Sequence, residues 1–174
     1  TKVKRSTDGL DSLPQDAKLI LKKIKSWKEK GGKIACAFGK VVCDSGVPFD
    51  GGPIHKNMKE WINHTIKSVE GSNTLLLIKP HPHELKEEIA CYLNEYFFDL
   101  IDNIDELPEN VILLGHKWFD IHVLGEFLDF GLIYNGTTSV ELGVLGIPSV
   151  LCSHFAPIDY PVGHIVPESE DHYK

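Results

Sequence analysis

The stretch LIYNGTTSVELGVLGIPSV, residues 132–150, constrains the fold more than any other part of the chain. It begins with a short apolar run and continues through a turn of small polar residues, NGTTS. Apolar residues at helical spacing follow, and Gly146 and Pro148 end that helix before a second apolar run. This order of strand, hydroxyl-rich turn, short helix and strand predicts a compact β-α-β unit.

The polar turn at residues 135–139 has two interpretations. Backbone N–H groups at the start of a helix favour an anion, and here hydroxyl and amide side chains surround them. The alternative is that Thr138 or Ser139 only caps the helix, with Glu141 completing the cap. We interpret the turn as a phosphate-binding site, because a second polar cluster, KPHPHE at residues 79–84, also follows a predicted strand.

Apolar runs and helical patterns alternate along the chain. Strands are expected at residues 33–38, 74–78, 111–114, 132–134 and 149–151. Helical patterns lie at residues 15–30, 55–69, 85–100 and 120–127, and the tail from residue 154 is expected to be irregular. The alternation predicts an α/β fold with a Rossmann-like, doubly wound parallel sheet of about five strands. We expect residues 1–32 to form a polar tail and an amphipathic helix, and residues 33–174 to form the Rossmann-like domain of a longer protein.

In a sheet of this kind, ligands bind beyond the carboxyl ends of the strands. The loops at residues 39–52, 79–84, 115–118 and 135–139 all belong to that edge. Lys79 and His81 follow a buried strand, where an ammonium and an imidazole suit a phosphate or a departing phosphoryl oxygen. The alternative is that His81 or His83 only caps a neighbouring loop. Glu84 either orients His81 or favours the start of the next helix.

Two carboxylates of the first loop, Asp44 and Asp50, are the ones best placed to face the same cleft. One of them is a candidate base towards an acceptor hydroxyl. The other interpretation is that both are turn residues, and we favour the turn for Asp50.

Composition excludes several classes of function. The net charge of -7 argues against nucleic-acid binding, and the single arginine, Arg5, lies in the tail. Nine histidines invite a metal, but His81-x-His83 has no evident third ligand, so we expect no catalytic metal. The chain has neither a G-x-G-x-x-G nor a P-loop motif, and no run long enough to span a bilayer. The four cysteines form no C-x-x-C pair and are expected to be reduced thiols of a cytosolic protein.

The two polar clusters together resemble segments of bacterial capsule polysaccharide biosynthesis proteins. Those are glycosyltransferases of the two-domain GT-B architecture, related to capsular Kdo-transferases and bacterial sialyltransferases, and their C-terminal half is Rossmann-like. Lys79, His81 and Pro82 match a Lys-x-His-Pro segment of that family. The second motif, a small polar turn followed by Glu and Gly-x-Pro, is matched by Ser139, Glu141, Gly146 and Pro148. The resemblance extends over about residues 33–174 and includes a tail motif at residues 157–173.

The resemblance implies a metal-independent donor-binding domain for a CMP- or UDP-sugar, acting in capsule or surface polysaccharide synthesis. No cofactor is expected besides the nucleotide-sugar substrate. The partners would be that donor and a saccharide or lipid-linked acceptor. The location would be the cytoplasm, including the inner face of the membrane if the full-length protein associates with it. The full-length protein would also contain the part of the active site that lies outside this chain.

The residue pattern and the resemblance together predict the site residues of this chain. The predicted catalytic residues are His81, Asp44 and Glu141. The predicted donor-binding residues are Lys79, Lys40, Gly115, His116, Asn135, Thr137, Thr138 and Ser139. Among them, His81 and residues 137–139 would meet the phosphates, and residues 115–117 the nucleobase. Other functions compatible with the same scaffold are a nucleotide-sugar epimerase or hydrolase, a polyol-phosphate transferase, and a non-catalytic Rossmann-like module.

Overall fold

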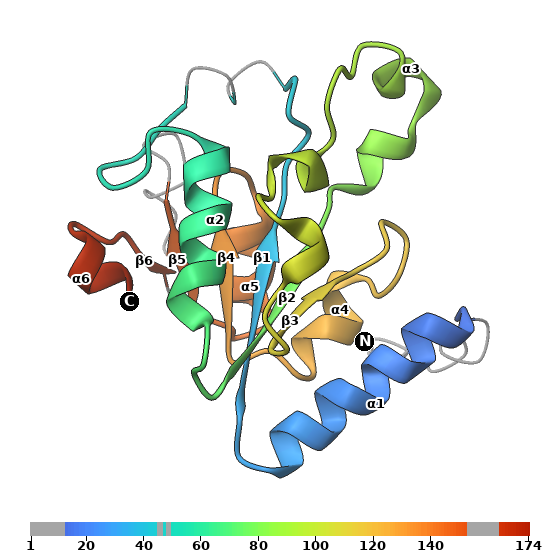
Figure 1. Ribbon diagram of the computed structural model, residues 1–174, viewed down its shortest axis with the longest axis vertical. Coiled ribbons are helices and arrows are strands. Elements are labelled where there is room, and N and C mark those ends of the chain that lie inside the picture. The colour runs from blue at the N-terminus through green and yellow to red at the C-terminus, as the bar shows by residue number, and fades with distance from the viewer. Residues whose placement is uncertain (1–12, 45–46, 48–49, 153–163) are drawn as a thin grey trace.

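The chain folds around one six-stranded sheet in which every neighbouring pair is parallel (Figure 1). The computed structural model describes residues 13–44, 47, 50–152 and 164–174. The strands are β1 (Lys33–Phe38), β2 (Thr74–Lys79), β3 (Val111–Leu113), β4 (Phe130–Ile133), β5 (Ser149–Leu151) and β6 (His164–Ile165). The predicted α/β class and Rossmann-like sheet are confirmed, with β6 as one strand more than the apolar runs indicated.

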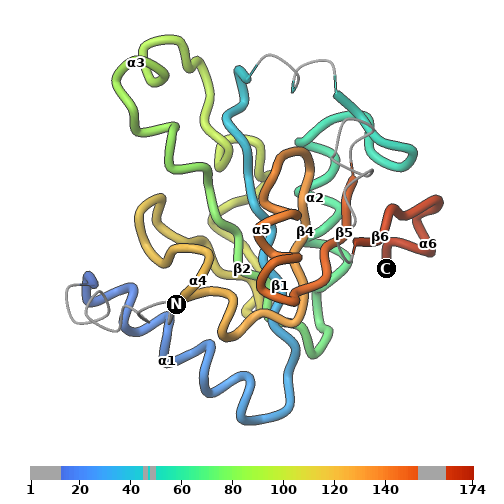
Figure 2. Tube along the Cα trace, turned by 180° about the vertical axis from the view of Figure 1, so that it is seen from behind, coloured from blue at the N-terminus to red at the C-terminus, as the bar shows by residue number. Residues whose placement is uncertain are grey.

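Helices cover both faces of this sheet (Figures 1 and 2). The α-helices are α1 (Gln15–Glu29), α2 (Met58–Val69), α3 (Glu87–Ala90), α4 (Ile121–Gly125), α5 (Thr138–Val144) and α6 (Glu170–Tyr173). Three 3-10 turns are η2 (Pro82–Leu85), η3 (Phe97–Leu100) and η4 (Ile104–Glu106). None of the helices in the described part of the chain is long and apolar enough to cross a membrane.

The strand order is β3-β2-β1-β4-β5-β6, so the direction in which strands are added reverses at β1. β1 pairs with β2 on one side and with β4 on the other. In the register, Phe38 lies opposite Lys79 of β2 and opposite Ile133 of β4. Three strands therefore end side by side at this reversal, which is where open α/β sheets bind ligands.

The two faces of β1 belong to two separate cores because successive side chains of a strand point to opposite sides. Ile34 and Cys36 belong to the core under α1, α4 and α5, on the face turned towards the viewer in Figure 2. Ala35 and Ala37 belong to the core under α2 and η3. Small alanine side chains leave room there for Trp61 of α2, which is fully buried.

The continuous helical pattern predicted for residues 85–100 is wrong. Only Glu87–Ala90 is α-helical, between η2 and η3. The segment does not present one apolar stripe to the core: Tyr92 is 74% exposed, whereas Phe97 is buried. The chain therefore turns back so that Phe97 can pack beneath α2.

Two further boundaries differ from the sequence predictions. Helix α2 begins at Met58 rather than at residue 55, because the side chain of Asn57 accepts the backbone N–H of Glu60 as its N-terminal cap. The tail contains β6 and α6 instead of being irregular throughout. The tail motif expected at residues 157–163, and the first loop at residues 45–46 and 48–49, lie outside the described residues.

Candidate functional site

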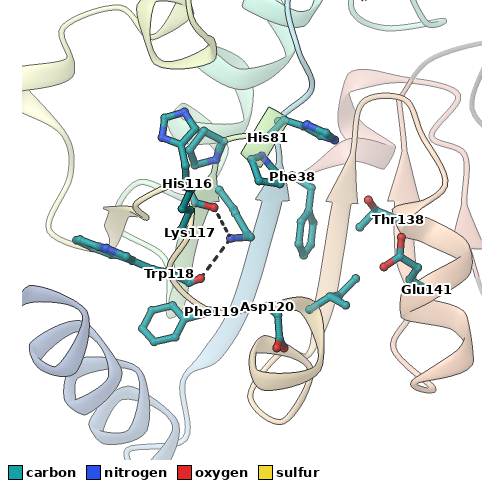
Figure 3. A pocket seen from close by; sticks show the side chains of 14 residues that line it. Phe38, His81, His116, Lys117, Trp118, Phe119, Asp120, Thr138 and Glu141 are labelled. Carbon is teal, nitrogen blue, oxygen red and sulfur yellow. Dashed lines mark hydrogen bonds between the residues drawn. The ribbon is translucent and has the colours of Figure 1, made fainter. Parts of the chain in front are cut away.

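A cavity of about 420 Å³ opens at the carboxyl ends of β1 and β2, beside the loop that follows β3 (Figure 3). We call it the strand-edge cavity. Its lining consists of Phe38, Gly39, Lys79, Pro80, His81, Pro82, His116, Lys117, Trp118, Phe119, Asp120, Ile121, Thr138 and Glu141. Segments far apart in the sequence therefore converge there, as predicted for loops that leave the same edge of a parallel sheet.

Lys79 ends β2 and places a half-buried ammonium in this cavity. Its Nζ donates to the backbone carbonyls of His116 and Trp118 at 3.4 and 3.5 Å, which are long hydrogen bonds (Figure 3). Burial lowers the pKa of Lys79. Among the described residues it forms no ion pair with a carboxylate, although partly buried charges are normally paired. The lysine is therefore suited to meet an anion from outside the chain.

His81 lies two residues further along, after Pro80 has fixed the direction of the backbone. Its Nδ1 accepts the backbone N–H of His83 at 3.2 Å. Burial is the main cause that lowers the pKa of His81, and the positive charges of His83 and Lys40 act in the same direction. A neutral imidazole with an accepting Nδ1 carries its proton on Nε2. His81 thus has one N–H donor available to a ligand.

Glu84 does not orient His81, which was one of the two roles predicted for it. Its carboxylate is buried, with Oε2 2.8 Å from Nε2 of His116. The other oxygen, Oε1, accepts the backbone N–H of Phe97 at 2.9 Å. Glu84 therefore joins two parts of the connection between β2 and β3 to the loop that follows β3, and it fixes the ring of His116 at the rim of the cavity. No local sequence pattern predicts the pairing of Glu84 with His116, because the two residues come from different loops.

The loop after β3 forms the aromatic wall of the cavity. Gly115 lies under the indole of Trp118, since a Cβ on Gly115 would come 2.6 Å from that ring. The next residue, Phe119, has a positive φ of 31° and turns its ring into the core below the cavity. Asp120 then caps α4 by accepting the backbone N–H of Val123 at 2.9 Å. Trp118 thus covers Gly115, the residue that the resemblance placed near a nucleobase.

Of the polar segment at residues 135–139, only Thr138 lines the cavity, and Glu141 lines it from the same helix α5; both face the loop after β3 in Figure 3. Ser139 is buried inside the first turn of α5, with Oγ 3.5 Å from the carbonyl of Gly136. Thr137 is exposed and precedes α5 without a side-chain capping bond, so the simple capping interpretation is not realised. Sequence spacing alone could not tell which hydroxyl of the turn would face the cavity.

Asn135 is held by the first loop. Its Nδ2 donates to the carboxylate of Asp50, and the hydroxyl of Tyr134 donates to the backbone carbonyl of the same residue. Asp50 is buried and lines neither the strand-edge cavity nor the one described next. Its observed role is to anchor the loop after β1 to the end of β4, in line with the structural role that we favoured for it.

Lys40 and Asp44 pair with each other at 3.1 Å outside the strand-edge cavity. They line a second cavity of about 470 Å³, which we call the loop cavity. Its lining consists of Lys40, Val41, Cys43, Asp44, His81, His83 and Ile89. His81 is the residue that both linings share. Seven of the predicted catalytic and donor-binding residues therefore line one or both of two adjoining cavities, whereas Gly115, Asn135, Thr137 and Ser139 line neither.

Four lining residues were not identified from the sequence: Phe38, Phe119, Asp120 and Ile121. Phe38 belongs to an apolar strand and carries no signal that separates it from core residues. Asp120 lies three residues before Val123, the spacing of a helix cap, but that spacing says nothing about a cavity. In the described residues, no group of three or more His, Cys, Asp and Glu side chains could hold a metal ion.

The fold and the site define an α/β protein with a Rossmann-like strand order and a cavity at the carboxyl edge of the sheet, lined by a lysine that forms no ion pair with a carboxylate of the described residues. Its fold is similar to that of KpsC from Thermosulfurimonas dismutans, a beta Kdo 2,7 transferase, with 15% identity and a TM-score of 0.47. The match covers 92% of this chain and 51% of that one, so the chain spans about half the length of that transferase. No protein-family model matches the sequence, and no curated protein matches it either.

Proposed function

We propose that the chain is the donor-binding domain of a glycosyltransferase, which holds a CMP- or UDP-sugar in the strand-edge cavity for capsule or surface polysaccharide synthesis. The observation that carries this proposal is the half-buried ammonium of Lys79, whose hydrogen-bond partners among the described residues are backbone carbonyls. A phosphate in the cavity would supply the missing negative charge. The match of Lys79, His81 and Pro82 to the family's Lys-x-His-Pro segment supports the same assignment.

The chemistry follows from where negative charge develops during glycosyl transfer. The bond between the anomeric carbon and the phosphate oxygen breaks, and its electron pair leaves with the phosphate. The acceptor oxygen forms the new bond to the anomeric carbon and loses its proton to a base, for which Asp44 is the candidate. Lys79 and the Nε2–H of His81 would stabilise the phosphate more strongly as its charge grows, which lowers the barrier. This assigns no step to a metal.

The remaining walls of the cavity suit the other parts of a nucleotide-sugar. Phe38 and Trp118 offer ring surfaces on which a base can stack. On the opposite side, the carboxylate of Glu141 can accept hydrogen bonds from ribose or sugar hydroxyls. We therefore place the base against the loop after β3 and the hydroxyl groups towards α5.

Calorimetric titration of the chain with CMP, UDP and GDP tests the proposal. We expect CMP or UDP to bind, and inorganic phosphate to compete with it for Lys79 and His81. If none of the three nucleotides binds at millimolar concentration to a folded sample, the proposal fails. Incubation with UDP-N-acetylhexosamines, followed by product analysis, separates the enzyme classes, because conversion without an acceptor would indicate an epimerase or hydrolase instead.

A further inference from the structure

The loop cavity is a second, chemically distinct space beside the strand-edge cavity. It lies between the loop that follows β1 and the loop that follows β2. Its volume of about 470 Å³ falls within the roughly 300–1,000 Å³ common for small-molecule sites. Besides His81, its lining residues are absent from the strand-edge cavity. The imidazole of His81 therefore lines both cavities, which is the position required of a group that contacts two substrates.

The polar groups of the loop cavity form a mixed set of donors and acceptors. Lys40 Nζ donates and the carboxylate of Asp44 accepts, and the two are 3.1 Å apart. His81 and His83 add two imidazoles, whose ring centroids are 4.7 Å apart. Each imidazole can donate from one nitrogen and accept at the other. Hydroxyl groups, which both donate and accept, match such a set better than a pure anion does.

The apolar part of the lining is small and flanks these polar groups. Val41 is buried at 6% exposure, and Ile89 is half-buried in the segment that follows η2. A pyranose ring has this combination of properties, because it carries hydroxyl groups at its edge and C–H groups on its faces. The cavity thus has the chemistry of a saccharide site.

Hydrogen bonds of the described residues order the loop within the Lys40–Asp44 pair and after it. The backbone N–H of Asp44 donates to the carbonyl of Val41 at 3.1 Å, and that of Val47 donates to the carbonyl of Asp44 at 2.8 Å. Further along, buried Asp50 is bound by Tyr134 and Asn135 at the end of β4. These contacts link the described residues of the loop to one another and, through Asp50, to the end of β4.

We propose that the loop cavity binds a saccharide, the acceptor of the transfer reaction, with Asp44 and His83 on its hydroxyl groups and His81 between it and the donor. The assignment to the acceptor rests on the proposed function, whereas saccharide binding itself can be tested separately. It places at least one acceptor contact in the same domain as the donor site.

Cys43 provides a reporter for this cavity. It is exposed and lines the loop cavity, and Cys91 is exposed elsewhere, after α3. The other two cysteines are buried, and burial raises the pKa of both thiols, that of Cys152 to about 12. Alkylation with iodoacetamide should therefore modify Cys43 and Cys91, and mass spectrometry of the peptides gives a separate rate for each thiol.

We expect galactose at high millimolar concentration to slow alkylation of Cys43 and to leave the rate of Cys91 unchanged. Cyclohexanol, which has a ring of the same size and one hydroxyl, should slow neither thiol. The proposal is overturned if galactose leaves Cys43 unaffected, if it slows both thiols equally, or if cyclohexanol protects Cys43 as well as galactose does. It is also overturned if CMP protects Cys43 to the same extent.

Substitutions then locate the effect. Asp44→Asn should weaken protection by galactose about fivefold, the loss expected for one hydrogen bond. Asp102→Asn is the matched control, because Asp102 forms a similar exposed pair with Lys59 at 3.0 Å away from both cavities. Equal effects of the two substitutions would contradict the assignment. CMP affinity, measured on the same samples, reports on the donor site alone, so its absence would contradict the proposed donor function and not the saccharide site.

Discussion

Lysines stand at both ends of the central strands, and their surroundings differ. Lys33 begins β1 with an exposed side chain 3.5 Å from the carboxylate of Asp129. The same carboxylate accepts the backbone N–H of Ile34 at 2.8 Å and lies 3.9 Å from Lys28. At the amino edge of the sheet, the carboxylate of Asp129 therefore balances the positive charge of the lysines. Such an exposed pair contributes little stability and calls for no ligand.

Lys79 ends the neighbouring strand at the carboxyl edge, where its hydrogen-bond partners within the described part of the chain are two carbonyl oxygens. Lys79 is more buried than Lys33. Because it forms no ion pair among the described residues, the loss of water around its ammonium group is compensated less well. The comparison teaches that charge at a strand end does not mark a site by itself. What marks the carboxyl edge is a partly buried charge without its counterion, next to a cavity.

The largest effect is expected from removing this charge. Lys79→Met should weaken CMP or UDP binding about 100-fold, or about 2.7 kcal/mol, because a charged hydrogen-bond donor to the phosphate is lost. Lys33→Met should leave the affinity unchanged, since its partner is Asp129. Calorimetry measures the nucleotide affinity of both variants. Equal affinities of Lys79→Met and Lys33→Met would contradict the claim that only the carboxyl edge of the sheet binds the nucleotide.

The second-largest effect is expected on stability, from removing the buried carboxylate that joins the loops of the carboxyl edge. Glu84→Ala is expected to lower the free energy of unfolding by about 3 kcal/mol, because the backbone N–H of Phe97 and the ring of His116 lose a buried partner. The exposed Glu87→Ala should change it by less than about 0.5 kcal/mol. Urea denaturation gives both values. A similar small change for the two variants would show that Glu84 does not hold the loops.

A histidine away from the carboxyl edge should affect stability but not binding. Burial lowers the pKa of His55 to about 4, and its Nε2 is 2.7 Å from Nδ1 of His64. The unfolded chain, with a pKa of about 6.5, binds the proton more readily between these values, so stability is complete above pH 6.5 and falls below it. The free energy of unfolding should drop by about 2 kcal/mol from pH 7 to pH 5 through this group.

Urea denaturation across that pH range checks this expectation, with His55→Gln as the variant that cannot titrate. The variant should show a shallower loss of stability towards pH 5, and its affinity for CMP at pH 7 should match that of the unchanged chain. An identical pH dependence of the two proteins would assign the loss to other groups. A changed CMP affinity would extend the binding site beyond the carboxyl edge.

The smallest effect separates two neighbouring hydroxyl groups. Thr138 lines the strand-edge cavity and Thr137 does not. Thr138→Val should weaken nucleotide binding about fivefold, the equivalent of one neutral hydrogen bond, and Thr137→Val should not change it. The same calorimetric titration distinguishes them. A larger loss for Thr137→Val would mean that the turn before α5 meets the ligand differently.

Sequence reasoning predicted what depends on local pattern. The apolar runs located the first five strands, and the rule for parallel sheets brought Lys79, His81 and Thr138 to one edge. Sequence reasoning did not predict the contacts that form between different loops. The bond from Glu84 to His116 and the separation of Lys40 from the strand-edge cavity depend on how long loops fold back on the sheet. Neither feature produces a periodic pattern of residues from which it could be predicted.

A structure of the chain soaked with CMP tests the central claim most directly. We expect a phosphate oxygen within hydrogen-bond distance of both Lys79 Nζ and His81 Nε2, with the base against Trp118. A nucleotide whose phosphate lies away from Lys79, or which occupies another face of the sheet, would contradict the account.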